Sequence, residues 1–256
     1  DAAHVPVERG DPRRFVVQPR GHARSGATGT SYRLTLCSLR SSIRSMHGDS
    51  RSGEPRGWHS RLYLPHFDAG ETPQTITFRL AGSLPTVLLR QWRDELRLQA
   101  AQLGDRERSR RPSLATLERQ RIEDYLNRGI GPIWLGDPRI GSLVEAAFLF
   151  FDGSRYRLHA WVVMPNHVHI VLTPDADISM TRIVSSWKSF TATRANELLG
   201  RTGAFWQADY FDRFIRDEAH FLAAVSYVEQ NPVVGGLCAA PEEWAFSSAS
   251  WRSRNP

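Results

Sequence analysis

The chain has few cysteines and no long apolar run. Cys37 and Cys238 are the only cysteines among its 256 residues, and their separation matches no zinc-ligand spacing. This excludes a zinc finger and a disulfide-stabilised scaffold, and it suits a reducing cytoplasm. The longest apolar run, around residues 148–151, is far too short to cross a bilayer. The beginning of the chain also lacks the apolar core of a signal peptide, so we expect a cytoplasmic protein that does not contact membranes.

Lysine is almost absent, because Lys188 is the only one among the 33 basic residues. The net charge of +6 is typical of proteins that bind nucleic acid, but it is unevenly distributed. Residues 1–45 hold eight arginines and three acidic residues, whereas the remaining chain holds 25 basic and 24 acidic residues. Bulk charge therefore does not identify what the main part of the chain binds.

The N-terminal part of the chain shows little sign of a core. Residues 1–45 lack apolar periodicity, so we expect a disordered extension. The first methionine is Met46, which leaves open whether this extension is native. Residues 57–68 are expected to form an extended arm that packs its aromatic side chains. The main domain is expected to span residues 46–256.

From residue 75 onward, apolar periodicity predicts alternating strands and helices. The last helix should end at Asn231, because Pro232 cannot continue it. The order of elements favours an α+β fold, in which an antiparallel sheet has helices packed on one face. Residues 85–135 are a helical insertion in this scheme. Strands are expected at 75–80, 156–164, 167–173 and 210–216, and helices at 85–103, 113–128, 137–151, 179–199 and 217–231.

Two histidines follow a tight turn at Pro165-Asn166. His167 and His169 lie two residues apart on a predicted strand, so their side chains share one face. Two adjacent imidazoles can chelate a divalent ion. The alternative is a pair of polar residues on the solvent face of the strand.

The last predicted helix carries a phenol and a carboxamide one turn apart. At about 100° per residue, Tyr227 and Asn231 lie on one flank of the apolar stripe, and Gln230 points away. These side chains could form a functional pair or simply be boundary residues beside the core.

The remaining motifs suggest contacts with nucleic acid. Lys188 and Ser189 lie beside a tryptophan on a helix, a combination that suits phosphate contact and base stacking. The aromatic run around Trp206, with Arg213 a few residues later, could stack on bases, although packing in the core is favoured for these aromatic residues. The alternative for Lys188 is an ordinary surface lysine.

In combination, these motifs resemble the REP-associated tyrosine transposases, which are single-tyrosine HUH nucleases of insertion sequences. The resemblance covers about residues 57–251. It rests on motifs that keep the family's order: Pro165-Asn166-His167-Val168-His169, residues 186–191, Phe205-Trp206-Gln207 with Tyr210-Phe211-Asp212-Arg213, residues 227–233, and Trp244 with Ser247-Ser248.

The resemblance implies a ferredoxin-like fold and a site for Mg²⁺ or Mn²⁺ held by His167 and His169. Asn231 stands where related enzymes carry a third ligand, although some relatives have glutamine there. Tyr227 corresponds to the nucleophile, which attacks single-stranded or hairpin DNA and forms a 5′-phosphotyrosine.

The resemblance thus predicts a DNA strand transferase that contacts its substrate through Lys188, Ser189, Trp206 and Arg213. Two other functions remain open: a non-catalytic hairpin-DNA-binding protein, and a metal hydrolase that uses the His-x-His pair. The latter is disfavoured because His220 is the only histidine after His169. The oligomeric state, monomer or homodimer, is left open, and the expected location is the cytoplasm, at the nucleoid.

Overall fold

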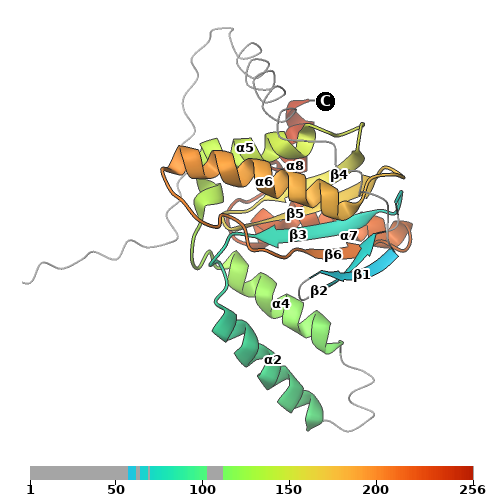
Figure 1. Ribbon diagram of the computed structural model, residues 1–256, viewed down its shortest axis with the longest axis vertical. Helices are drawn as coiled ribbons and strands as arrows, with labels where there is room; N and C mark the ends of the chain where they lie inside the picture. The colour runs from blue at the N-terminus through green and yellow to red at the C-terminus, as the bar shows by residue number, and fades with distance from the viewer. Residues whose placement is uncertain (1–56, 62–63, 69, 103–111, 256) are drawn as a thin grey trace, which may run out of the picture.

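The structure, a computed structural model, describes residues 57–61, 64–68, 70–102 and 112–255 (Figure 1). The predicted extension over residues 1–45 lies outside this part of the chain. No helix in the described ranges is long and apolar enough to span a membrane.

The centre of the fold is a four-stranded antiparallel sheet. In spatial order its strands are β4 (Tyr156–Val163), β5 (His167–Pro174), β3 (Gln74–Arg79) and β6 (Phe211–Phe214). Along the chain, two helices alternate with these strands as β3-α5-β4-β5-α6-β6, which is the ferredoxin-like arrangement. The α+β class and the antiparallel sheet predicted from the sequence are therefore confirmed.

Helices α5 (Pro138–Leu149) and α6 (Met180–Leu199) lie together on one face of the sheet (Figure 1). They enclose the main core, in which Phe148 packs against both Phe78 of β3 and Trp187. Both helices begin at a residue whose side chain caps the first turn. The Asp137 side chain accepts a hydrogen bond from the Arg139 N–H, and that of Ser179 accepts one from the Arg182 N–H.

A third helix, α7 (Glu218–Val234), covers the opposite face of the sheet, so the prediction of helices on one face only is incomplete (Figure 1). The physical reason is that β4 and β5 are apolar on both sides. Val162 and Val171 point away from the main core and pack with Val228 of α7 in a second, smaller core. A sheet with two apolar faces needs a covering layer on each.

The predicted end of α7 at Asn231 is wrong, because the helix passes through Pro232 and ends at Val234. Proline removes one helical hydrogen bond, but the bonds beyond it form normally, including the one from the Gly235 N–H to the Asn231 carbonyl. Pro232 is also buried, so packing helps to keep it helical.

The helical insertion is a hairpin of α2 (Thr86–Ala101) and α4 (Leu114–Asn127) that projects from the sheet (Figure 1). Ion pairs Arg93–Glu118 and Arg121–Glu95 join the two helices, each at 2.8 Å. The C-terminal end of α4 contacts the sheet, where the buried Leu126 lies.

Shorter elements complete the fold. The expected extended arm is a two-stranded antiparallel hairpin of β1 (Gly57–Arg61) and β2 (Leu64–Asp68), which lies beside β6. The 3₁₀ turns η1 (Trp134–Gly136) and η2 (Pro241–Glu243) and the short helix α8 (Ser248–Arg254) are absent from the sequence-based prediction. Their length of seven residues or fewer leaves no periodic apolar pattern to detect.

Candidate active site

The two histidines of β5 lie on the face of the sheet opposite the main core. In the β3–β5 pairing, Thr77 lies opposite His169, and Arg79 lies opposite His167. Residues directly opposite each other on antiparallel strands have side chains on the same face, in contact. The Thr77 hydroxyl is accordingly 2.9 Å from His169 Nδ1.

A chain of hydrogen bonds sets the orientation of the His167 ring. The Asn166 Nδ2 group donates to the Leu126 carbonyl of α4 at 3.0 Å, which turns Asn166 Oδ1 toward His167 Nδ1 at 2.6 Å. Because an amide oxygen only accepts, His167 Nδ1 carries the proton, and Nε2 keeps its free lone pair. Outer hydrogen bonds of this kind are typical of histidines that bind metals.

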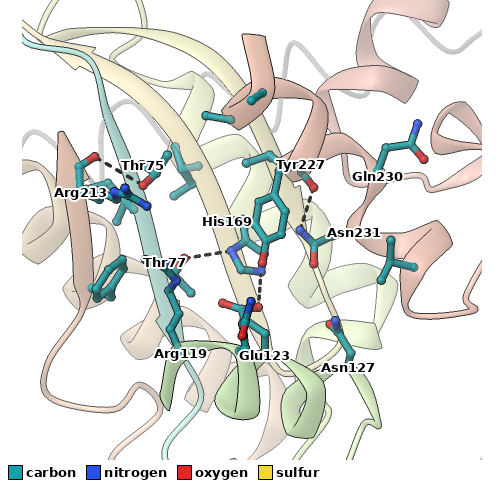
Figure 2. Close-up of a pocket in the computed structure, with 18 of the residues that line it drawn as sticks. Thr75, Thr77, Arg119, Glu123, Asn127, His169, Arg213, Tyr227, Gln230 and Asn231 are labelled. Atoms are coloured by element: carbon teal, nitrogen blue, oxygen red, sulfur yellow. Dashed lines mark hydrogen bonds and ion pairs between the residues drawn. The ribbon is translucent and has the colours of Figure 1, made fainter. Parts of the chain in front are cut away.

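A carboxylate from the helical insertion completes a cluster with the two histidines. Glu123 of α4 lies 3.3 Å from His169, measured from Oε2 to Nε2. Potential ligand atoms of Glu123, His167 and His169 all lie within 4.8 Å of one another. Figure 2 shows Glu123 reaching up from α4 toward His169 on the sheet.

The sequence-based prediction did not include Glu123. The available signal was Glu123 and Asn127 at a spacing of one helical turn on α4, the same spacing as Tyr227 and Asn231 on α7. This pattern alone does not tell which part of the sheet the helix contacts.

Unsatisfied polar atoms show that the cluster fits a metal ion. His167 Nε2, His169 Nε2 and Glu123 Oε2 are buried, and none makes a hydrogen bond within the described part of the chain. Buried polar atoms normally have partners, because leaving one unpaired costs roughly 1–3 kcal/mol. Three such atoms facing one another, two nitrogens and one carboxylate oxygen, form a donor set suited to a divalent cation.

Electrostatics keeps Glu123 and His167 in metal-binding protonation states. Burial would raise the pKa of Glu123, but the neighbouring His169 and His167 outweigh it, and the pKa falls to about 2. Burial, followed by the charge of His169, lowers the pKa of His167 to about 3. The carboxylate is therefore ionised and the His167 imidazole neutral at neutral pH, as metal coordination requires.

Tyr227 reaches over this cluster from α7. Its ring centre is 5.5 Å from that of His169, and Figure 2 shows the phenol pointing toward Glu123. Burial, followed by the charge of Glu123, raises the pKa of the Tyr227 phenol, so the hydroxyl keeps its proton in this state. The residue is still 49% exposed, which leaves a route for a substrate to reach it.

Asn231 lies one turn beyond Tyr227, and Gln230 points away from both (Figure 2). The Asn231 side chain is only 2% exposed, and its Nδ2 group donates to the Tyr227 carbonyl at 2.9 Å. Both residues line a cavity of about 450 Å³ together with His169 and Glu123. Asn127 of α4 lines the same cavity, and its buried Oδ1 has no hydrogen-bond partner in the described ranges.

Of the predicted DNA contacts, Arg213 alone lines this cavity. Ser189 is exposed on α6, on the other side of the sheet. The Lys188 ammonium donates to the carbonyls of Gln207 and Ala208 at 2.6 and 2.7 Å, so it braces a loop.

The prediction that Trp206 stacks on DNA bases does not agree with the structure. The residue is 6% exposed, its ring packs edge-on against Phe78, and its indole N–H donates to Thr191. Apolar burial and a satisfied N–H account for this tryptophan, and neither face of its ring is open to a base.

Comparison with known proteins finds a family model that covers the two histidines and the tyrosine. Residues 145–231 match the family model described as "Transposase IS200 like". The matched segment is therefore similar to the IS200-like transposases. This region contains His167, His169, Tyr227 and Asn231, whereas Glu123 lies outside it on α4.

One sequence match and one structural match are both named as REP-associated tyrosine transposases. The REP-associated tyrosine transposase of Escherichia coli (strain K12) is 29% identical over 96 residues, which are 36% of this chain and 54% of that protein. The chain thus matches about half the length of this relative. A solved structure of a REP-associated tyrosine transposase bound to a REP hairpin aligns with a TM-score of 0.43 and 17% identity, over 77% of this chain and 84% of that one. The predicted resemblance to the REP-associated tyrosine transposases is confirmed.

Proposed function

We propose that this chain is a metal-dependent endonuclease and strand transferase for single-stranded or hairpin DNA, with Tyr227 as nucleophile. One observation carries the proposal: the potential ligand atoms of His167, His169 and Glu123 make no hydrogen bond in the described chain and face one another beneath the Tyr227 phenol. The IS200-like region and the REP-associated relative support DNA as the substrate. The proposed place of action is the cytoplasm, on DNA of the nucleoid.

The proposed metal ligands are His167, His169 and Glu123. Asn231, predicted as a ligand from the family resemblance, remains a proposed further ligand, and its bond to the Tyr227 carbonyl also fixes it beside the nucleophile. Two nitrogen ligands tilt the preference toward Mn²⁺ over Mg²⁺. When bound, the ion neutralises the Glu123 charge beside the phenol and polarises the scissile phosphate.

Tyr227 then acts in a transesterification. Its oxygen forms a bond to phosphorus, the bond from phosphorus to the 3′-oxygen breaks, and the products are a 5′-phosphotyrosine and a free 3′-OH. The phenol proton passes to solvent water, and the departing 3′-oxygen takes up a proton from solvent. Because the number of phosphodiester bonds is conserved, another 3′-OH can later attack the phosphotyrosine and rejoin the strands.

The decisive experiment compares Tyr227→Phe with Tyr210→Phe. Tyr210 is 6% exposed and packs in the main core, so it serves as the matched control. Each protein is incubated with Mn²⁺ and a labelled DNA hairpin that has single-stranded flanks, and denaturing gels report covalent adducts. We expect the adduct with the parent protein and with Tyr210→Phe, and none with Tyr227→Phe.

Mass spectrometry of the trapped adduct should place the nucleotide on the peptide that contains Tyr227. A nucleotide on Tyr210 instead would overturn the assignment. Tight hairpin binding without any adduct, across a full Mn²⁺ titration, would show a non-catalytic DNA-binding protein.

A further inference from the structure

The cavity beside Tyr227 has a basic side that the proposed chemistry does not use. Arg119 of α4, Arg213 of β6 and His220 of α7 line it. In Figure 2, Arg119 and Arg213 lie on one side of His169, and Asn231 lies on its other side. Within the described residues, neither guanidinium forms an ion pair with a carboxylate, although Asp124 lines the same cavity.

The three basic side chains present hydrogen-bond donors to this space. The Arg119 guanidinium lies 5.6 Å from the centre of the Phe211 ring, which supports its flat face. His220 Nδ1 accepts a hydrogen bond from the Arg216 backbone N–H, so the proton of the neutral ring is on Nε2. Burial, followed by the charges of Arg119 and Arg216, lowers the pKa of Arg213, which shows that the positive charges repel one another.

An anion would relieve this repulsion. Guanidinium groups bind phosphate oxygens through two parallel hydrogen bonds, and an imidazole N–H adds a third donor. A single DNA strand that presents one phosphate to Tyr227 carries further phosphates on both sides of it. The cavity continues from Tyr227 to the two arginines, so a neighbouring phosphate can reach them without a change in the fold.

We propose that Arg119, Arg213 and His220 bind the DNA phosphate next to the one that Tyr227 attacks. This inference rests on the proposed function. It assigns a second role to α4, because Arg119 precedes the proposed ligand Glu123 by one helical turn. One helix of the insertion then holds both the metal and the strand.

The test measures binding without chemistry. Tyr227→Phe protein is mixed with a fluorescent hairpin with single-stranded flanks, in EDTA, over a range of salt concentrations. A second substitution in this protein, Arg119→Gln or Arg213→Gln, should raise the Kd for the hairpin about tenfold. It should also reduce the slope of log K against log salt by about 0.7 for each phosphate that the variant no longer binds. Arg90→Gln is the matched control, because Arg90 is exposed on α2 and does not line the cavity.

A second measurement locates the phosphate. Replacing flank phosphates one at a time with neutral methylphosphonates should weaken binding most at one position beside the cleavage site. In the Arg119→Gln background, the same replacement should cost little more, because the arginine that would bind this phosphate is already gone. An unchanged salt slope, or fully additive effects at every position, would refute the proposal. Unchanged Mn²⁺ binding by Arg119→Gln checks that the site is intact.

The outcomes separate the two proposals. If the parent protein forms the Tyr227 adduct and the arginine variants bind DNA normally, the proposed function stands and the phosphate site is wrong. If no adduct forms but the arginine variants no longer bind one located phosphate, the phosphate site stands and the proposed catalysis is wrong.

Discussion

The two faces of the sheet use the same strands for different purposes. On β3, Ile76 and Phe78 point into the main core under α5 and α6, whereas Thr77 between them faces the cavity. On β5, Val168 and Ile170 enter the main core, whereas His169 between them faces Glu123. Because side chains alternate along a strand, a closely packed apolar layer lies on one face of the sheet, and a cluster of polar atoms without hydrogen bonds lies on the other.

The difference lies in how each face is completed. On the apolar face, aromatic rings such as Phe148 and Trp187 are packed by other protein groups, with centres 4.9 Å apart. On the second face, His167 and His169 are buried beneath α4 and α7, yet their Nε2 atoms make no hydrogen bond in the described chain. Both apolar cores should contribute to stability, and the polar cluster on the second face should determine the response to ligands.

The largest effect on stability is expected from the apolar face. Phe148→Ala removes a ring that is 0% exposed, so the free energy of unfolding should fall by about 3–5 kcal/mol. Urea denaturation measures the change. Leu222→Ala on α7, where the side chain is 60% exposed, should change it by no more than about 0.5 kcal/mol. Equal losses of stability in the two variants would contradict the placement of Phe148 in the main core.

The polar cluster should contribute to stability only when it binds a metal ion. Mn²⁺ at 100 times its Kd should stabilise the parent protein by about 2.7 kcal/mol. His169→Ala should fold but lose this gain and lose cleavage, because one of the two proposed nitrogen ligands is gone. Thermal unfolding with Mn²⁺ and with EDTA measures the effect. A variant that Mn²⁺ stabilises as much as the parent would contradict the ligand assignment, and the same titration on Glu123→Gln tests the third ligand.

A smaller effect on stability is expected from Lys188, which lies on α6. Lys188→Met leaves the carbonyls of Gln207 and Ala208 without this donor, so the free energy of unfolding should fall by about 1–3 kcal/mol. Fluorescence anisotropy with hairpin DNA tests the phosphate contact predicted from the sequence. Weaker DNA binding with unchanged stability would show that the lysine serves the DNA rather than the loop.

The smallest effect is expected from the N-terminal segment. A chain that begins at Met46 should unfold within about 1 kcal/mol of the full chain and form the same adduct, because residues 1–45 have no apolar periodicity. Differential scanning calorimetry and the adduct assay check this. A larger loss of stability would mean that the segment packs on the domain.

Local patterns were sufficient to predict most of the fold. The helix expected at 179–199 is α6, with Ser179 as its N-cap and Gly200 at φ 60° as its C-cap. The strands at 156–164 and 167–173 match β4 and β5 closely, because periodicity and turn chemistry act within a few residues. The helical period also placed Asn231 beside Tyr227, with Gln230 turned away.

Features that depend on distant contacts could not be predicted in this way. Nothing near Glu123 shows that the end of α4 docks on β5, since this depends on contacts such as the one between Asn166 and the Leu126 carbonyl. The helix through Pro232 also depends on burial of that proline by distant residues. The sequence also leaves both stacking on DNA and packing in the core open for Trp206, because its partner Phe78 lies far away in the chain.

The wide spacing of the site along the chain has a consequence for protein synthesis. The site draws on four elements, β3, α4, β5 and α7, which supply Thr77, Glu123, His169 and Tyr227. The proposed nucleophile Tyr227 is the last of these residues to leave the ribosome. At about 5–20 residues per second, several seconds separate His169 from Tyr227. During that interval the nascent chain contains Glu123, His167 and His169 but not the proposed nucleophile. Strand cleavage by the proposed mechanism therefore requires a chain that has been synthesised at least as far as Tyr227 of α7.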